Sequence, residues 1–161
     1  LAPCPTILVH GERVQKDWMP RRILIPTNGS MAARRAAQVA FALFTGGENE
    51  EAIILNVIEQ RDSHYSLGTG DGWEERELNI ADQMVGELRT MGEVQGVSTS
   101  GAVRRDEDTA SGILESAREE GVDLIVLGTN VRAGSERLYL GPKVERVLRS
   151  SPCPVMIVNS M

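Results

Sequence analysis

Five short apolar runs punctuate this chain, and the stretches between them carry apolar residues at every third or fourth position. Short apolar runs bounded by turn residues are typical of buried strands, and the wider spacing is typical of a helix that buries one face. The third run is weaker and alternates with polar residues, which predicts a strand near an edge of its sheet. The predicted strands are residues 22–27, 52–59, 97–103, 122–128 and 154–159.

Four helices are expected between these strands. The first, residues 31–44, has alanine and phenylalanine on one face and arginine on the other, and Ser30 is placed to cap it. The third is expected to be capped by Asp108 or Thr109. Strands that alternate with helices through short connections predict an α/β fold, in which helices cover both faces of a parallel sheet. The other three helices are expected at residues 73–91, 109–120 and 142–151.

The composition fits one soluble domain. The chain has 161 residues, of which 25% are charged and 41% are hydrophobic, and its formal net charge is −6. That length suffices for a core without disulfide or metal staples. A net negative chain is a poor partner for nucleic acid, and no apolar run approaches the roughly 18 residues that a membrane span requires. We therefore expect a cytoplasmic protein that binds no nucleic acid.

One phrase occurs at both ends of the chain: residues 3–10 read PCPTILVH and residues 152–159 read PCPVMIVN. The two cysteines, Cys4 and Cys153, either form a disulfide or are each a small buried hydrophobe at the start of a strand. So few cysteines without a secretory signal favour the buried thiol. Neither the cysteines nor the two histidines have the spacing of a metal site, so no metal is expected.

The most specific stretch of the chain, residues 122–158, resembles the C-terminal half of the universal stress protein family. Family members that bind ATP share a pattern of Gly, two residues, Gly, nine residues, Gly and then Ser or Thr. On this chain the pattern starts at Gly128 and has its third glycine at Gly141. The sequence ILIPTNGS, residues 23–30, resembles the family's opening strand and turn. The resemblance therefore covers nearly the whole chain.

The resemblance implies an adenine nucleotide alpha hydrolase-like fold, a doubly wound five-stranded parallel sheet in the order 3-2-1-4-5. Ligands of such sheets bind where the strand order reverses, which lies between the first and fourth strands in this order. Carried over from the family, Val57 would lie against an adenine ring, and Gly141 and the start of the last helix would face phosphates. The implied nucleotide- or anion-binding residues are Pro26, Thr27, Asn28, Val57, Gly128, Thr129, Arg132, Gly141, Lys143 and Val144.

Three positions depart from the ATP-binding pattern. Val131 stands where the second glycine is expected, Pro142 replaces the hydroxyl residue, and Asn28 replaces an aspartate. A β-branched residue resists the positive φ that glycine allows, and proline lacks an N–H, so we expect weak or absent ATP binding. Pro142 nevertheless suits the first position of a helix, whose positive end, with Lys143 and Arg132, still favours a small anion.

Basic residues gather in and just after the loop that follows the fourth strand. Two interpretations stay open: they form an anion pocket, or they lie on a solvated helix face among acidic residues. These residues are Arg132, Arg137, Lys143 and Arg146. No Ser-His-Asp or Cys-His arrangement can be assembled around His10 and His64, so the protein is not expected to be an enzyme. No resident cofactor is expected; the ligand considered is ATP or another adenine nucleotide.

In the 3-2-1-4-5 order the last strand is an edge, and an apolar edge invites pairing. Universal stress domains resemble one another in dimerising through this strand, and tandem members pair their two repeats in the same way. Residues 5–9 are therefore expected to form a sixth strand, antiparallel to residues 154–158 of the same or of a second chain, with Cys4 and Cys153 too far apart for a disulfide. The expected dimer interface is Pro154, Val155, Met156, Ile157 and Val158.

The expected organisation is the terminal strand of a preceding repeat at residues 1–10, a linker at 11–21 and a universal stress protein domain at 22–161. The sequence of residues 127–148 resembles that of the C-terminal cytoplasmic domains of bacterial cation/proton antiporters. The first hypothesis is thus a regulatory and dimerisation module of such a transporter, with the membrane part of its own parent as partner and a degenerate nucleotide site. The alternative is an ATP-binding universal stress protein that acts as a nucleotide-dependent stress-response factor.

Overall fold

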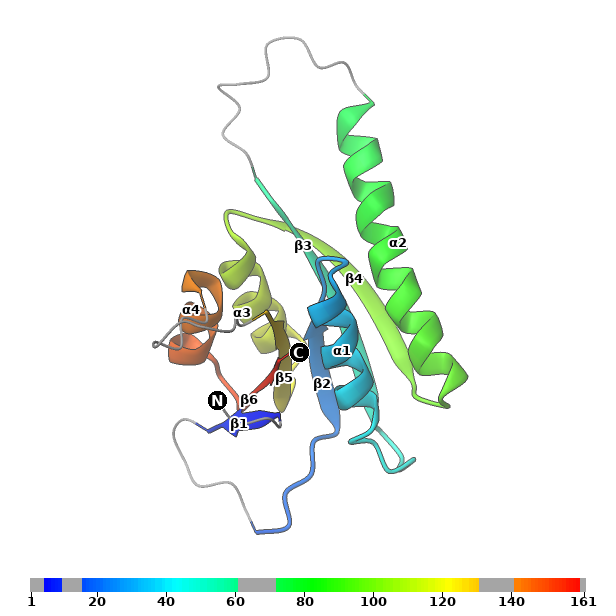
Figure 1. The fold of residues 1–161 in the computed structure, drawn as a ribbon, viewed down its shortest axis with the longest axis vertical. Coiled ribbons are helices and arrows are strands. Elements are labelled where there is room, and N and C mark those ends of the chain that lie inside the picture. The colour runs from blue at the N-terminus through cyan, green and yellow to red at the C-terminus, as the bar shows by residue number, and fades with distance from the viewer. Residues whose placement is uncertain (1–4, 10–15, 61–71, 131–140, 160–161) are drawn as a thin grey trace.

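The computed structural model describes residues 5–9, 16–60, 72–130 and 141–159. They form one six-stranded sheet in the order β1-β6-β5-β2-β3-β4 (Figure 1). The strands from β2 to β6 are parallel to their neighbours, and β1 is antiparallel to β6. This confirms the 3-2-1-4-5 order with an additional N-terminal edge strand. The strands are β1 (Thr6–Leu8), β2 (Arg22–Pro26), β3 (Glu51–Glu59), β4 (Thr99–Asp106), β5 (Leu124–Thr129) and β6 (Val155–Asn159).

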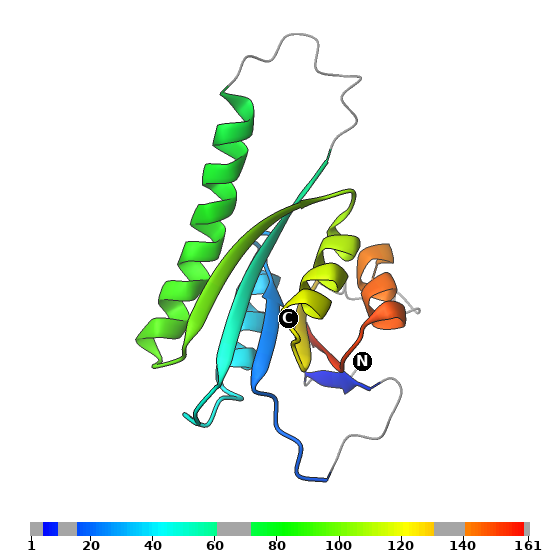
Figure 2. The same ribbon diagram turned by 180° about the vertical axis from the view of Figure 1, so that it is seen from behind.

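Helices cover both faces of the sheet, α1 and α2 on one face and α3 and α4 on the other (Figures 1 and 2). The four helices are α1 (Met31–Phe41), α2 (Trp73–Val94), α3 (Thr109–Glu119) and α4 (Pro142–Ser150). Each presents an apolar face to the strands and a polar face to solvent, as the spacing of its apolar residues predicts. Of the helices in the described ranges, none is both long and apolar enough to cross a bilayer.

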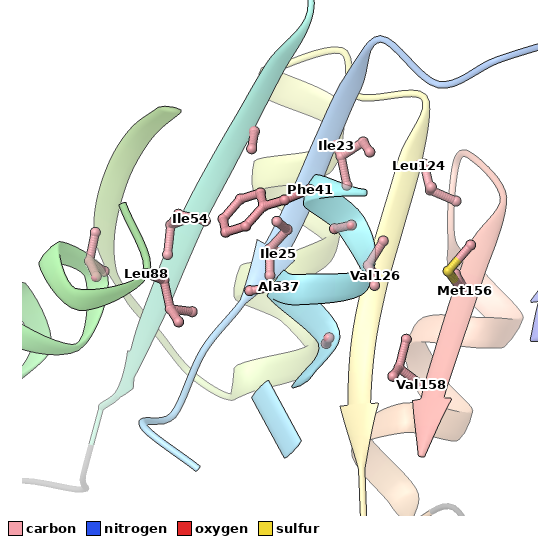
Figure 3. Packing of buried hydrophobic residues seen from close by; sticks show 14 residues of the cluster. Ile23, Ile25, Ala37, Phe41, Ile54, Leu88, Leu124, Val126, Met156 and Val158 are labelled. Atoms are coloured by element: carbon pink, nitrogen blue, oxygen red, sulfur yellow. The ribbon is translucent and has the colours of Figure 1, made fainter. Parts of the chain in front are cut away.

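The side chains of the central strands alternate between two apolar cores. Ile23 and Ile25 of β2 pack in the core beneath α1 and α2, whereas Leu24 between them packs in the core beneath α3 and α4. Figure 3 shows Phe41 and Ala37 of α1 over Ile25 in the first of these cores. A strand buried on both faces carries a continuous apolar run, which is why β2, β3 and β5 stood out in the sequence.

Two helix starts agree with the expected caps. The Ser30 hydroxyl accepts a hydrogen bond from the Ala33 amide at 3.2 Å, and the Asp108 carboxylate accepts one from the Ser111 amide at 2.9 Å. Asp108 is therefore the cap of α3, and Thr109 is its first helical residue. Each cap satisfies an amide that has no partner within its helix.

Several predicted boundaries are wrong by a few residues. Helix α1 ends at Phe41 rather than at residue 44, because the Leu43 amide donates to the Ala40 carbonyl in a tighter turn. Helix α2 continues to Val94 instead of ending at residue 91. The start of β5, Leu124, lies two residues later than the expected 122. These shifts leave the order and direction of the elements unchanged.

Strand β4 differs most from expectation, since it runs from Thr99 to Asp106 rather than over residues 97–103. It pairs with β3 as far as Glu59 and Asp106, so it includes Arg104 and Arg105. It is an outer strand of the sheet, with a neighbouring strand on one side only, which confirms the predicted edge position. Its arginines pair with Glu77 of α2 and Glu119 of α3, and Arg104 also pairs with Asp106 of β4 itself.

The pairing of β1 with β6 has the symmetry of two copies of one strand. Ile7 lies opposite Met156, and Leu8 lies opposite Val155. When the two repeated phrases are aligned in sequence, Ile7 also corresponds to Met156. Equivalent residues therefore lie opposite each other, as they would if two identical antiparallel strands were related by a two-fold axis between Ile7 and Met156. The prediction that residues 5–9 pair antiparallel with the last strand is confirmed, and the pairing lies within one chain. Dimerisation through Pro154 to Val158 stays a prediction.

Cys153 begins the turn into β6 as a buried residue with a free thiol. It packs in the core beneath α3 and α4, and its burial raises the pKa of the thiol above its ordinary value. The expectation of a small buried hydrophobe is therefore confirmed for Cys153. Cys4 lies outside the described residues.

Candidate functional site

A pocket of about 180 Å³ opens at the carboxyl ends of β2 and β5, where the strand order reverses. Its walls come from the loop after β2, the ends of β3 and β5, and the first turns of α1, α3 and α4. This is where doubly wound sheets hold their ligands. Seven of the ten predicted site residues line it: Pro26, Thr27, Asn28, Val57, Gly128, Lys143 and Val144.

The other three predicted residues are placed differently. Thr129 is buried, with 6% of its surface exposed, and continues β5 directly after Gly128. Gly141 precedes the first turn of α4. Among the described residues, neither of these two lines the pocket. Arg132 lies outside the described residues, as does Val131, the position expected to obstruct ATP.

The loop after β2 is held by hydrogen bonds from its own side chains. The Thr27 hydroxyl accepts from the Gly29 amide at 3.1 Å, and the Asn28 side-chain carbonyl accepts from the Ser30 amide at 3.1 Å. The Asn56 amide group, buried beneath, donates to the Thr27 carbonyl at 2.8 Å. An aspartate in place of Asn28 would accept the same bond from Ser30. Asn28 thus keeps the turn that an aspartate would form.

Gly128 brings β5 against the first turn of α1. A β-carbon on this residue would lie 2.1 Å from the carbonyl oxygen of Ala32 and 2.3 Å from the carbonyl carbon. No side chain fits at such distances from rigid backbone, so only glycine allows this contact. The first glycine of the nucleotide motif therefore has a packing role that does not involve a ligand.

Apolar side chains form the deep part of the pocket. Leu55 in the middle of β3 and Leu127 near the end of β5 are buried, and Ile113 of α3 lines the same part of the pocket. Val57 lies against Gly112, where a β-carbon would come within 2.6 Å of a Val57 methyl group. The absence of a side chain at Gly112 thus lets α3 approach β3 and fixes Val57 beside the pocket. The result is an apolar slot at the place expected for an adenine ring.

The start of α4 forms the polar end of the pocket. Gly141 has φ of +91°, which favours glycine, and Pro142 occupies the first helical position. The Glu145 amide is the first to bond within the helix, to the Gly141 carbonyl at 3.0 Å. The amides of Lys143 and Val144 therefore have no acceptor within α4 and carry the positive end of the helix dipole. Both residues line the pocket.

Two ion pairs tie the first turn of α4 to neighbouring elements. The Lys143 ammonium lies 2.6 Å from the Glu59 carboxylate at the end of β3, and the Arg146 guanidinium lies 2.7 Å from Asp108, the cap of α3. The Lys143 hydrogen bond, followed by those from Thr109, lowers the pKa of Glu59 to about 2. The bond from the Ser111 amide, followed by those from the Arg146 and Ser111 side chains, lowers the pKa of Asp108.

These contacts resolve part of the choice left open for the basic residues. Lys143 and Arg146 neither converge on an empty anion pocket nor lie free on a solvated face. Both hold α4 against β3 and α3, and Lys143 also borders the pocket. Arg132 and Arg137 lie outside the described residues. The sequence did not predict that Glu59 and Asp108 lie near the site. Their partners, Lys143 and Arg146, are 84 and 38 residues away along the chain.

Comparison with known proteins agrees with this geometry. The sequence model of the Universal stress protein family matches residues 19–159. The chain belongs to this family. Universal stress protein MJ0531 of Methanocaldococcus jannaschii is 28% identical over 157 residues, which cover 96% of this chain and 88% of that protein.

Solved structures of universal stress proteins share the fold of this domain. The structure of MJ0577, also of Methanocaldococcus jannaschii, has a TM-score of 0.75 at 25% sequence identity and covers 89% of this chain and 99% of its own. An Arabidopsis thaliana universal stress protein family protein, solved with AMP bound, has a TM-score of 0.62 at 15% identity, with coverages of 88% and 93%. The second likeness concerns the fold alone.

The described residues of this universal stress protein domain fit an adenine nucleotide in part. The apolar slot of Leu55, Val57 and Ile113 suits a planar base, and the amides of Lys143 and Val144 suit a phosphate. The carboxylate of Glu59 beside Lys143 does not suit a phosphate, since like charges repel. The pocket therefore matches the base well and a highly charged phosphate chain less well.

Proposed function

We propose that this universal stress protein domain binds an adenine nucleotide in the pocket between β2 and β5. One observation carries the proposal: a single pocket joins an apolar slot, formed around Val57, to the unbonded amides of Lys143 and Val144 at the positive end of α4. Small-molecule sites combine a mostly apolar lining with a few convergent polar groups in this way. The base would enter the slot, and a phosphate would accept from the amides.

The relatives described above favour this reading over the transporter module expected first. They are named as universal stress proteins, and one of them was solved with AMP bound. The hypothesis that the domain is attached to an antiporter depends on the sequence of residues 127–148. Residues 131–140 of that stretch lie outside the described part of the chain. The nucleotide proposal does not depend on that attachment, because it uses the pocket alone.

We expect binding without turnover. The hydroxyl groups of Thr27 and Ser30 in the pocket wall accept hydrogen bonds from backbone amides that shape the turn and the cap. A nucleophile needs an adjacent base that takes its proton. The Thr109 hydroxyl donates to the Glu59 carboxylate, but a carboxylate with a pKa of about 2 is a weak base. Chromatography after prolonged incubation with ATP and magnesium should recover the nucleotide unchanged.

Calorimetric titration with AMP tests the proposal. The unmodified domain should show saturable binding with one site. Val144→Trp should abolish it, because the indole would fill the pocket from the first turn of α4. Val94→Trp is the matched control: the same substitution at a residue of α2 that is 82% exposed should leave binding unchanged.

Thermal melting of both variants separates loss of binding from loss of fold. Val144→Trp should melt within a few degrees of the unmodified domain, since Val144 is only partly buried. Absence of AMP binding by the unmodified domain, or binding that survives Val144→Trp in a folded protein, would place the ligand elsewhere and overturn the proposal.

A further inference from the structure

Glu59, at the end of β3, accepts three hydrogen bonds at one oxygen, all from residues that line the pocket. Its Oε1 accepts from the Lys143 ammonium at 2.6 Å, from the Thr109 hydroxyl at 2.7 Å and from the Thr109 amide at 3.2 Å. Lys143 and Thr109 both line the pocket. The carboxylate is therefore fixed beside the polar end of the pocket, next to the first turn of α4.

This position changes the charge that a ligand would meet. Lys143, the one basic residue among the described residues that line the pocket, is already paired with Glu59, and Arg146 in the same turn is paired with Asp108. These two pairs thus place two positive and two negative side-chain charges around the first turn of α4. A phosphate would gain the amides of α4 without gaining a net positive field from the side chains.

A phosphate could draw Lys143 away from Glu59 at small cost. The two side chains are 60% and 44% exposed, and exposed ion pairs contribute about 1 kcal/mol or less. Glu59 would nevertheless stay in place, because Thr109 still donates two hydrogen bonds to it. Its negative charge would then face the phosphate directly, and the repulsion would grow with each added phosphate charge.

We propose, on the basis of the function proposed above, that Glu59 determines the phosphate specificity of the pocket and makes it select adenine ligands of low negative charge. Adenosine and AMP are then preferred to ADP and ATP. The pKa of Glu59, lowered to about 2, keeps the carboxylate charged at every physiological pH, so the selection does not switch with pH.

Calorimetry with Glu59→Gln tests the inference with adenosine, AMP, ADP and ATP, without magnesium and at low salt. Glutamine keeps an oxygen that accepts from Thr109, so the local geometry is preserved while the charge is removed. Adenosine affinity should be unchanged. AMP should bind about threefold more tightly and ATP about tenfold more tightly, equivalent for ATP to about 1.4 kcal/mol. High salt should shrink the difference between the two proteins, because it screens the repulsion.

Glu93→Gln is the matched control. Glu93 of α2 also pairs with a basic side chain, Arg89, and accepts from a threonine hydroxyl, that of Thr99, but neither of these partners lines the pocket. The control removes the same charge elsewhere on the domain, and it should leave all four affinities unchanged.

The possible failures are distinguishable. If Glu59→Gln binds all four ligands as the unmodified domain does, or tightens all four equally, Glu59 does not select by charge and the inference is overturned while the nucleotide function stands. If neither protein binds adenosine or any nucleotide, the proposed function fails and the inference falls with it.

Discussion

Gly128 of β5 and Ala32 of α1 lie in backbone contact, so close that a β-carbon on Gly128 would stand 2.1 Å from the Ala32 carbonyl oxygen. The contact seats the first turn of α1 on the sheet beside the pocket, and it requires glycine whether or not a ligand binds. The presence of this glycine in the nucleotide motif is therefore explained by the packing of the domain and is not by itself evidence of phosphate binding.

Gly128→Ala should destabilise the domain strongly. Overpacking in cores costs about 1 to 3 kcal/mol, and a clash with backbone falls at the upper end, because backbone has no other rotamer to adopt. Urea denaturation should therefore show a loss of about 3 kcal/mol or failure to fold. Gly86→Ala in α2 is the control, since nothing lies within 4 Å of a β-carbon there, and it should stabilise by about 0.5 to 1 kcal/mol. Equal stability of the two variants would disprove the contact.

Asp108 caps α3 and also holds Arg146 of α4. Asp108→Ala removes both interactions and should lower the free energy of unfolding by about 1 to 2 kcal/mol. Asp108→Asn keeps a capping oxygen and should lose less than half of that. Asp82→Ala, on the exposed face of α2, should change stability by less than about 0.5 kcal/mol. A loss for asparagine as large as for alanine would show that the ion pair, and not the cap, dominates.

The Glu59–Lys143 pair should make stability depend on pH in the acid range. The pKa of Glu59 is lowered from its ordinary value of 4.5 to about 2, so the charged form is favoured in the folded state. This stabilisation is complete above 4.5 and is lost as the pH falls towards 2. The pair is exposed and screened by solvent, which limits the difference between the unmodified domain and Glu59→Gln to about 1 kcal/mol at neutral pH. Urea denaturation at decreasing pH should show this difference shrinking below 4.5; a constant difference would contradict the pairing.

Removing residues 1–10 should increase self-association. The deletion takes away β1 and leaves the outer edge of β6 with unpaired backbone groups, which is a template for pairing with a second copy. Sedimentation velocity should then show a concentration-dependent dimer or precipitation. Removing only residues 1–4 leaves β1 intact and serves as the control. Unchanged sedimentation of the longer deletion would mean that β1 does not protect this edge.

The sequence predicted the elements whose residues are constrained by burial. β2, β3 and β5 are covered on both faces, so Leu24, Ile54 and Val126 had to be apolar whatever their neighbours were. The caps were also readable, because Ser30 and Asp108 act on amides three residues further along. Local interactions leave a local signal, and these elements were placed within a few residues.

What the sequence did not reveal depends on contacts between distant segments. Strand β4 extends to Asp106 because Arg104 and Arg105 find acidic partners on α3 and α2, and an arginine pair alone does not predict a strand. The contacts of Glu59 with Lys143 and Thr109 were not predicted for the same reason, because these residues come from three different elements. The likeness to the universal stress protein family pointed to the pocket, but it did not reveal that an acid lies beside its cation.

β1 and the β6 strand of a second copy would compete for the same edge of β6, and β1 has the advantage of being part of the same chain. Residues 9–21 join β1 to the rest of the domain, so β1 reaches its edge at an effective concentration on the order of millimolar. The β6 strand of another copy, present at about micromolar concentration, is outcompeted about a thousandfold if the two strands pair equally well. Because Ile7 takes the place that a second Met156 would occupy, we expect this edge to stay closed at micromolar protein concentration and not to open on dilution.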